Sequence, residues 1–193
     1  MDTIFQHARY TLHRQVFALT GKFRLFDPAN NLVMYSEQKR FTFREDIRVY
    51  ADEAKSRDVL SIKARQIMDF SAAYDVVDTQ LNQKVGALRR KGLQSILRDE
   101  WEVLDQNDNV IGRLFEDSMG LAILRRLLLG SWLPQDYDLF LNSQRVADLR
   151  QNFNLFRYEL NLDFSMDTAH ALDRRLGIAA GILLAAIEGK QSN

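Results

Sequence analysis

The chain contains 193 residues, of which 46% are hydrophobic and 27% charged, and only two are prolines. That composition fits one globular domain over residues 1–193 and excludes an extensively disordered chain. The 26 basic residues balance the 26 acidic ones and cysteine is absent, which excludes attraction to nucleic acid by net charge, disulfide bonds and thiolate chemistry.

The chain begins without the pattern of a targeting segment. Between Met1 and Tyr10 no basic stretch is followed by an apolar run, so we expect neither a signal peptide nor a leading membrane anchor. A cytoplasmic location, at most peripheral to a membrane, is the default expectation. The residue pattern leaves the oligomeric state open, and a monomer is taken as the default.

A short pattern recurs along the chain: a large apolar residue, a charged residue and an aliphatic residue. This alternation has the period of a β-strand. After five copies a polar stretch leads into a second apolar run, as Asp105 to Asn109 does before Val110 to Phe115, which predicts a β-hairpin. The six copies are Phe23-Arg24-Leu25, Ile47-Arg48-Val49, Tyr74-Asp75-Val76, Trp101-Glu102-Val103, Tyr137-Asp138-Leu139 and Tyr158-Glu159-Leu160.

These copies predict a large antiparallel sheet. A leading strand at Tyr10–Phe17, five hairpins and a final strand at Tyr158–Phe164 give about twelve strands. An open sheet of this size would expose edges that pair with other chains, so we expect a closed, mainly antiparallel barrel. Twelve strands enclose a lumen that their own side chains do not fill, so another element must occupy it.

The longest interval between copies contains an amphipathic stretch, Met119–Pro134. Two interpretations stay open for it: an interfacial helix that places its apolar face among lipid tails, and a short helix that covers one mouth of the barrel. The second is favoured, because so short a stretch buries little area and soluble proteins usually cover such a face. On a helical wheel Leu121, Ile123, Leu124, Leu127 and Leu128 share one face, opposite Arg125 and Arg126, with Trp132 beside them.

The strongest helix signal lies at Asp167–Glu188. Asp167 is the candidate N-cap, and Gly189 stands where a helix C′ residue belongs. The run Leu176–Ile187 is apolar on every side, so it must be buried in protein or in lipid. Twelve residues rise about 18 Å against a hydrocarbon core of about 30 Å, which favours burial in the barrel over a membrane span. Gly177 and Gly181 keep this helix narrow, and a lumen that it fills leaves no room for a small ligand.

Several of these features together resemble the LURP-one-related family, which is similar to tubby C-terminal domains and phospholipid scramblases. The resemblance spans nearly the whole chain and implies a closed barrel around a central helix. One departure is Asn30-Asn31, where the family often has a turn glycine; asparagine also accepts the left-handed conformation. The features are Gly21-x-Phe23-x-Leu25-x-Asp27 followed by Leu32, the turn aspartates Asp78 and Asp105, and the closing apolar helix.

Metal-binding motifs are weak. Asp105-x-Asn107-x-Asn109 with Glu116 imitates a calcium-binding EF-hand loop, but Val110 stands where that loop needs glycine and the flanks are strands, so a polar hairpin turn is favoured. His7, His13 and His170 lack metal-ligand spacing, and we expect surface or packing roles for them.

No sequence motif indicates a reaction. The chain has no G-x-S-x-G elbow, no phosphate-binding glycine loop and no evident acid–base pair, so we expect a protein that is not an enzyme and needs no cofactor. The family resemblance instead implies a binding module that engages anionic phospholipid or phosphoinositide at a membrane surface. The alternative is a soluble regulatory protein with a protein partner; lipid scrambling is the third and least favoured interpretation.

The candidate anion contacts come from charge alone. Three basic clusters could meet phosphate oxygens, although solvated surface charge is the simpler interpretation. The clusters are Lys39-Arg40, Arg89-Arg90-Lys91 and Arg125-Arg126, with Trp132 as a possible headgroup-level contact.

Overall fold

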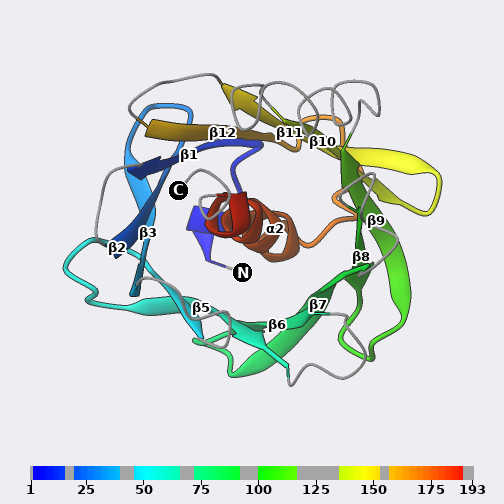
Figure 1. Ribbon diagram of the computed structural model, residues 1–193, viewed down its shortest axis with the longest axis horizontal. Helices are drawn as coiled ribbons and strands as arrows, with labels where there is room; N and C mark the ends of the chain where they lie inside the picture. The colour runs from blue at the N-terminus through cyan, green and yellow to red at the C-terminus, as the bar shows by residue number, and fades with distance from the viewer. Residues whose placement is uncertain are drawn as a thin grey trace.

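Twelve antiparallel strands close into a barrel around a helix near the end of the chain (Figure 1). The structure is a computed structural model, and it describes residues 2–15, 20–39, 46–65, 72–91, 100–116, 135–152 and 157–188. The strands are β1 (Arg9–Gln15), β2 (Thr20–Phe26), β3 (Leu32–Lys39), β4 (Ile47–Tyr50), β5 (Asp58–Ala64), β6 (Ala73–Asp78), β7 (Gln83–Arg90), β8 (Glu100–Leu104), β9 (Val110–Glu116), β10 (Asp136–Leu141), β11 (Gln144–Asn152) and β12 (Arg157–Asp163). The 3-10 helix η1 (Thr3–Phe5) precedes β1, and the helix α2 (Arg174–Glu188) follows β12.

The predicted strand arrangement is confirmed. One leading strand, five hairpins and one final strand follow each other around the ring, and β1 closes it by pairing with β12 along seven residue pairs. The large apolar residues of the repeated triplets face inward, because alternate residues of a strand point to opposite faces. Phe23, Val49, Val76 and Leu139 are each at most 1% exposed.

The two ends of the barrel carry different elements. Even-numbered strands finish at the end that we call the turn end, together with the five hairpin turns, the residues before β1 and the residues between β12 and α2. Odd-numbered strands finish at the opposite end, which we call the far end.

Three of the hairpin turns share one construction. The carboxylate of an aspartate at the first position accepts a hydrogen bond from the N–H of the residue four positions later. The residue three positions after the aspartate adopts the left-handed conformation. Asparagine and aspartate tolerate that conformation better than most residues, which explains the turn without glycine at Asn30. The bonds are Asn31 to Asp27 (2.8 Å), Ser56 to Asp52 (3.1 Å) and Asn109 to Asp105 (2.9 Å), and the left-handed residues are Asn30 (φ 63°), Lys55 (φ 58°) and Asp108 (φ 67°).

The helix begins later than predicted. We expected Asp167 to cap it, but α2 starts at Arg174 and the capping position falls to Asp173, whose carboxylate accepts the N–H of Arg175 at 3.0 Å. Asp167 instead folds the connection before the helix: its carboxylate accepts the N–H groups of Ala171 and Leu172 at 2.9 and 3.0 Å. Gly189 lies outside the described residues.

Polar contacts hold the beginning and the end of α2 in the barrel. At its start Arg174 bonds the carboxylate of Asp167 at 2.8 Å, and Arg175 bonds that of Asp78 in β6 at 2.6 Å. Toward its other end Arg14 of β1 donates to the carbonyl of Ala185 at 2.5 Å. Between these anchors the helix is apolar and buried, as expected.

Small residues let the helix approach the wall. A Cβ atom added at Gly177 would lie 2.7 Å from Cζ of Phe164, and one at Gly181 would lie 2.8 Å from Cδ2 of Leu162. Both distances are shorter than van der Waals contact, so a larger residue at either position would force Phe164 or Leu162 to move.

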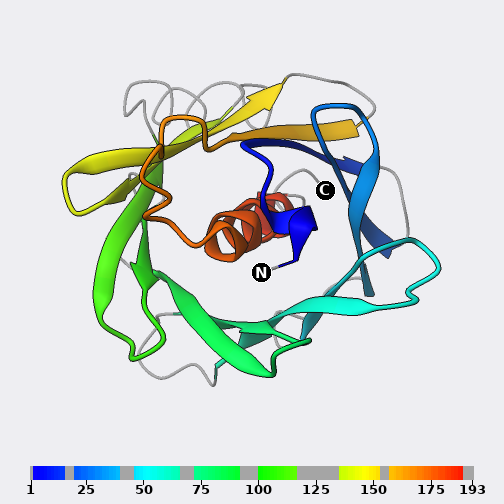
Figure 2. The ribbon, with the colours of Figure 1, turned by 180° about the vertical axis from the view of Figure 1, so that it is seen from behind.

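α2 lies inside the ring of strands, between β12 and β1 on one side and β6 and β7 on the other (Figure 1). The helix packs mainly against β12 and β7, with β1 and β6 beside them. On the side of β2 and β3 the lumen also receives η1, which lies beside α2 inside the ring (Figure 2). Phe5 of η1 is 1% exposed and belongs to the same apolar core as the lumen residues. The sequence pattern gave no indication of this inward segment.

Candidate functional site

The predicted basic cluster at residues 89–91 ends β7 at the far end of the barrel. Its members do not share one face. Arg89 lies opposite Glu102 of β8, whereas Arg90 lies opposite Trp101, which is 3% exposed. Because neighbouring residues of a strand face opposite ways, Arg89 and Lys91 belong to the outer surface and Arg90 to the lumen side.

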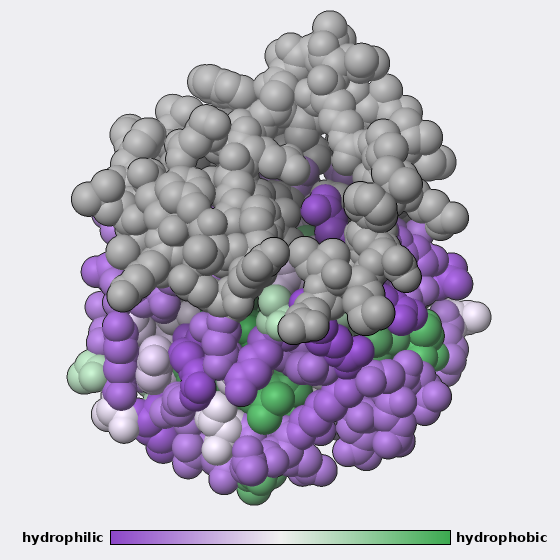
Figure 3. Space-filling view, turned by 60° about the horizontal axis from the view of Figure 1, so that its bottom comes forward, coloured by the Kyte–Doolittle hydropathy of each residue, from purple (hydrophilic) through white to green (hydrophobic). Residues whose placement is uncertain are grey.

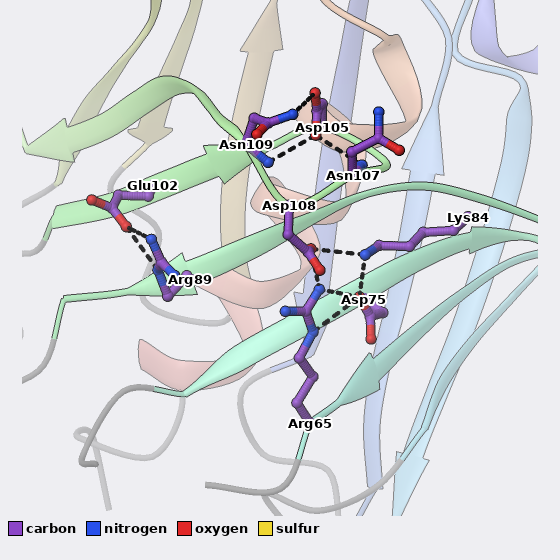
Figure 4. A network of polar contacts seen from close by, with 9 residues as sticks. All are labelled: Arg65, Asp75, Lys84, Arg89, Glu102, Asp105, Asn107, Asp108 and Asn109. Atoms are coloured by element: carbon purple, nitrogen blue, oxygen red, sulfur yellow. Dashed lines mark hydrogen bonds and ion pairs between the residues drawn. The ribbon is translucent and has the colours of Figure 1, made fainter. Parts of the chain in front are cut away.

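On the outer surface the cluster is larger than the sequence indicated, because β8 and β9 contribute to it. Nε of Arg89 lies 2.7 Å from Glu102, and Nζ of Lys91 lies 2.9 Å from Glu100 (Figure 4 shows the Arg89 contact). Arg113 of β9 reaches Glu100 only at 3.9 Å, and its side chain is 59% exposed. We call Arg89, Lys91, Arg113, Glu100 and Glu102 the basic patch; it holds three cations over two carboxylates.

Sequence inspection missed Arg113 and the two glutamates. The glutamates flank Trp101, so the strand alternation that buries Trp101 also places both of them outside. That alternation could have located them. The pairing of β7 with β8 and of β8 with β9, which brings all five charges together, is a property of the folded sheet.

Arg90 meets an aromatic pair on the lumen side. The rings of Tyr74 and Trp101 lie 6.0 Å apart. Burial raises the pKa of the Tyr74 phenol, and the charge of Arg90 acts in the opposite direction. Arg90 therefore stands close enough to influence a buried tyrosine and does not add its charge to the basic patch.

A second charged network lies on the outer face nearer the turn end (Figure 4). Arg65 contacts Asp75 at 2.6 Å and Asp108 at 2.5 Å, and Lys84 contacts Asp108 at 2.7 Å. Hydrogen bonds from Lys84 and Arg65 hold the pKa of Asp108 below its ordinary value. Two cations and two carboxylates neutralise each other here, so this network offers no surplus charge to a ligand.

The hairpin turn that imitated a calcium loop is a polar turn in the structure. The Asp105 carboxylate accepts hydrogen bonds from the N–H of Asn107 and from the backbone and side chain of Asn109, at 2.8 to 3.0 Å (Figure 4). Glu116 stands at the other end of β9 and is 2% exposed, so it does not join the turn. Among the described residues no three His, Asp or Glu side chains are arranged to hold a metal ion.

The histidines occupy separate places. His7 meets the edge of Tyr10, His13 contacts Glu159 of β12 at 3.1 Å, and His170 lies 3.4 Å from Arg174. These contacts fit the packing and surface roles expected for them.

The remaining sequence candidates cannot be placed. Arg125, Arg126 and Trp132 lie outside the described residues, as do Arg40 and the whole Met119–Pro134 segment. The residues that flank this segment, Glu116 at the end of β9 and Gln135 before β10, lie at the far end with the basic patch. The described surface on the side of β5 to β7 is largely hydrophilic, with isolated apolar positions (Figure 3).

One protein family matches most of the chain. A family model described as LURP-one-related matches residues 8–185. No curated protein matches the chain. Among the described residues no helix has the length and apolar character needed to cross a membrane.

Proposed function

Because the chain belongs to the LURP-one-related family, we propose that it is a non-enzymatic binding module and that its far end engages anionic phospholipid at a membrane surface. The observation that carries this proposal is the basic patch. Arg89, Lys91 and Arg113 gather on adjacent strands beside Glu100 and Glu102, the carboxylates that contact them within the described part of the chain, and Arg113 comes no closer than 3.9 Å to Glu100.

The turn end supports the same orientation. The aspartates Asp27, Asp52 and Asp105 receive their hydrogen bonds from neutral donors, so their charges are not balanced by a bonded cation. These hydrogen bonds lower the pKa of each carboxyl, which keeps it ionised at neutral pH. A negatively charged surface would therefore repel the turn end and attract the far end.

Vesicle co-sedimentation tests the proposal. The protein should bind vesicles that contain phosphatidylserine or phosphoinositide at low salt, ignore vesicles of phosphatidylcholine alone, and be released as salt rises. The triple variant R89S/K91S/R113S should bind at least about tenfold more weakly, since each basic residue near an anionic surface is worth about 1 kcal/mol.

A matched triple variant controls for charge. R9S/K55S/K84S removes the same number of cations from positions that are paired with carboxylates elsewhere on the barrel. It should retain binding. Equal losses in both triples, or no binding by the unmodified protein at low salt, would rule out the basic patch as a lipid contact. A variant with Arg125 and Arg126 replaced by serine tests whether that pair contributes to vesicle binding.

A protein partner is the second candidate, and it has its own observation at the turn end. Leu81 is 61% exposed and Val110 is 48% exposed, each beside one of two successive hairpin turns. Apolar tips among turn aspartates suit a partner with a basic surface. Absence of vesicle binding, together with weakened capture of such a partner by L81S/V110S, would favour this function over the first.

A further inference from the structure

The segment before β1 presents two different groups to the barrel. Phe5 is buried in the lumen, while the carboxylate of Asp2 bonds Arg57 in the turn between β4 and β5 at 2.5 Å. The segment thus combines an apolar group that enters the lumen with a negative charge held at the rim of the turn end.

The segment is held by short-range contacts and by apolar burial. It forms no ladder with a strand, and η1 contains only three residues. Its hydrogen bonds to the rest of the chain include that of the Tyr10 hydroxyl, which donates to the Ile4 carbonyl at 2.8 Å. The side chains of Asp2 and Arg57 are 26% and 41% exposed, so water reaches their ion pair. Exposed ion pairs contribute little to stability, so burial of Phe5, with Ile4 packed partly against the same core, is the principal force.

The place that Phe5 occupies is part of the barrel rather than of the segment. α2 packs mainly against β12, β7, β1 and β6, and η1 lies in the lumen on the side of β2 and β3 (Figures 1 and 2). The family model begins its match at residue 8, after this segment. Withdrawal of the segment would open an apolar space at the turn end and leave Arg57 without the Asp2 carboxylate.

We propose that residues 2–6 are a displaceable plug, and that the site beneath them accepts a medium-chain fatty acid, whose chain replaces Phe5 and whose carboxylate replaces Asp2 on Arg57. The chemistry follows from what the plug supplies: an apolar body of limited length and one carboxylate at the rim. A neutral chain satisfies only the first requirement, and a short carboxylate satisfies only the second. The proposal differs from the expectation that a lumen filled by the helix has no room for a small ligand, because it places the ligand where η1 now lies.

Three probes separate the two requirements: decanoate below its micelle-forming concentration, decanol, and butyrate. F5A removes the competing side chain and should bind decanoate at least about tenfold more tightly than the unmodified protein, because the chain no longer has to displace a buried phenylalanine. D2N should tighten decanoate binding to a smaller degree. Calorimetric titration, together with the ligand-induced rise in melting temperature, measures both effects.

Arg57 supplies the test of specificity. In the F5A background R57M should reduce decanoate affinity to that of decanol, whereas R9M, which removes an equally charged residue paired with Asp163, should not. F23A is the cavity control, since Phe23 is also 1% exposed but lies in β2. Equal affinity of F5A for decanoate and decanol would refute the role of Arg57, and a folded F5A that binds neither probe would refute the site.

The unmodified protein gives a readout that does not depend on a cavity variant. The amides of Phe5 and Gln6 are bonded to the carbonyls of Asp2 and Thr3 within the plug. Decanoate should accelerate their hydrogen exchange by displacing the plug, while decanol and butyrate at equal concentration should have less effect. Unchanged exchange at saturating decanoate would overturn the proposal. Because the site lies at the turn end, this outcome is independent of vesicle binding at the far end.

Discussion

Asp167 and Arg174 form an ion pair whose side chains are 0% and 7% exposed. Burial by itself raises the pKa of Asp167, but the N–H donors of Ala171 and Leu172 and the Arg174 guanidinium outweigh it, so the pKa lies below its ordinary value. The guanidinium also lies 4.9 Å from the ring of Phe164. The Asp167 carboxylate therefore fixes the conformation of the connection that precedes α2.

Replacing Asp167 by alanine should be strongly destabilising. The change leaves the Arg174 guanidinium buried without its carboxylate, a type of change that costs about 3–5 kcal/mol. Urea denaturation measures the loss. R9A is the matched control, because the Arg9 side chain is 65% exposed in its pair with Asp163 and its removal should cost less than about 1 kcal/mol. Similar losses in D167A and R9A would contradict this account.

Gly177 should not tolerate a methyl group. Alanine favours a helix over glycine by about 1 kcal/mol, yet its Cβ would press on the fully buried ring of Phe164, and overpacking costs about 1–3 kcal/mol. We expect G177A to lower the free energy of unfolding, and F164L to recover part of the loss in the double variant. G21A is the control, since its Cβ would make only ordinary contacts of 3.4 Å or more. A more stable G177A would show that the ring can move.

At the scale of elements, the hairpin turns make the stability depend on pH. The pKa of Asp105 lies below its ordinary value of 3.8, chiefly because of the hydrogen bond from the side chain of Asn109, and Asp27 and Asp52 are lowered in the same way by Asn31 and Ser56. A lowered folded pKa means that the stabilisation is complete above the ordinary value and is lost as the pH falls through the folded value.

The triple variant D27N/D52N/D105N should therefore melt at a lower temperature than the unmodified protein at pH 7, and the difference should disappear in strong acid. Melting curves from pH 7 to pH 2 measure it. Since the bonding donors are neutral, 1 M salt should leave most of the difference in place. A difference that is constant with pH would show that the carboxylate charge has no part in it.

Elements that depend on local alternation could be predicted from the sequence, and those that depend on distant partners could not. The repeated triplets indicate which face of each strand is apolar, and this was enough to predict the hairpins and the closed barrel. The start of α2 could not be predicted in this way, because Asp167 and Asp173 are both suitable N-caps, and the carboxylate of Asp167 instead bonds the connection before the helix and the guanidinium of Arg174. The burial of Phe5 depends on a lumen built by residues far along the chain.

The candidate site shows the same division. The outward position of Arg89 and Lys91 follows from strand alternation, and so does the inward position of Arg90. Their neutralisation by Glu102 and Glu100 required the register between β7 and β8. The contribution of Arg113 required a further strand.

At the scale of the whole molecule, the barrel is weakly paired between β3 and β4. β4 contains four residues, and among the described residues it pairs with β3 at Tyr35 with Tyr50 and at Ser36 with Val49. Side chains supplement this pairing: the Ser36 hydroxyl donates to the Arg48 carbonyl at 2.7 Å, and Lys55 in the following turn reaches back to Glu37 at 2.8 Å.

The amides of β4 should consequently be among the first in the barrel to exchange with solvent, and S36A should accelerate their exchange about tenfold by leaving a carbonyl unbonded. Hydrogen exchange followed by NMR measures this. T11V is the control. Thr11 belongs to β1 and its hydroxyl bonds Asn161 of β12, and seven residue pairs join these two strands. Uniform acceleration across all strands in S36A would indicate global destabilisation instead of local opening.

The order of the elements along the chain also has a consequence for biosynthesis. The strand that closes the ring and the helix that fills it are both encoded after residue 156, and the ring closes by joining β12 to β1, as in the bond from Arg9 to Asp163 across 154 positions. A ribosome therefore releases almost the whole sheet before its filling exists. Native packing must therefore wait for β12 and α2, and until both have been synthesised the apolar inner face of the sheet lacks the partner that buries it.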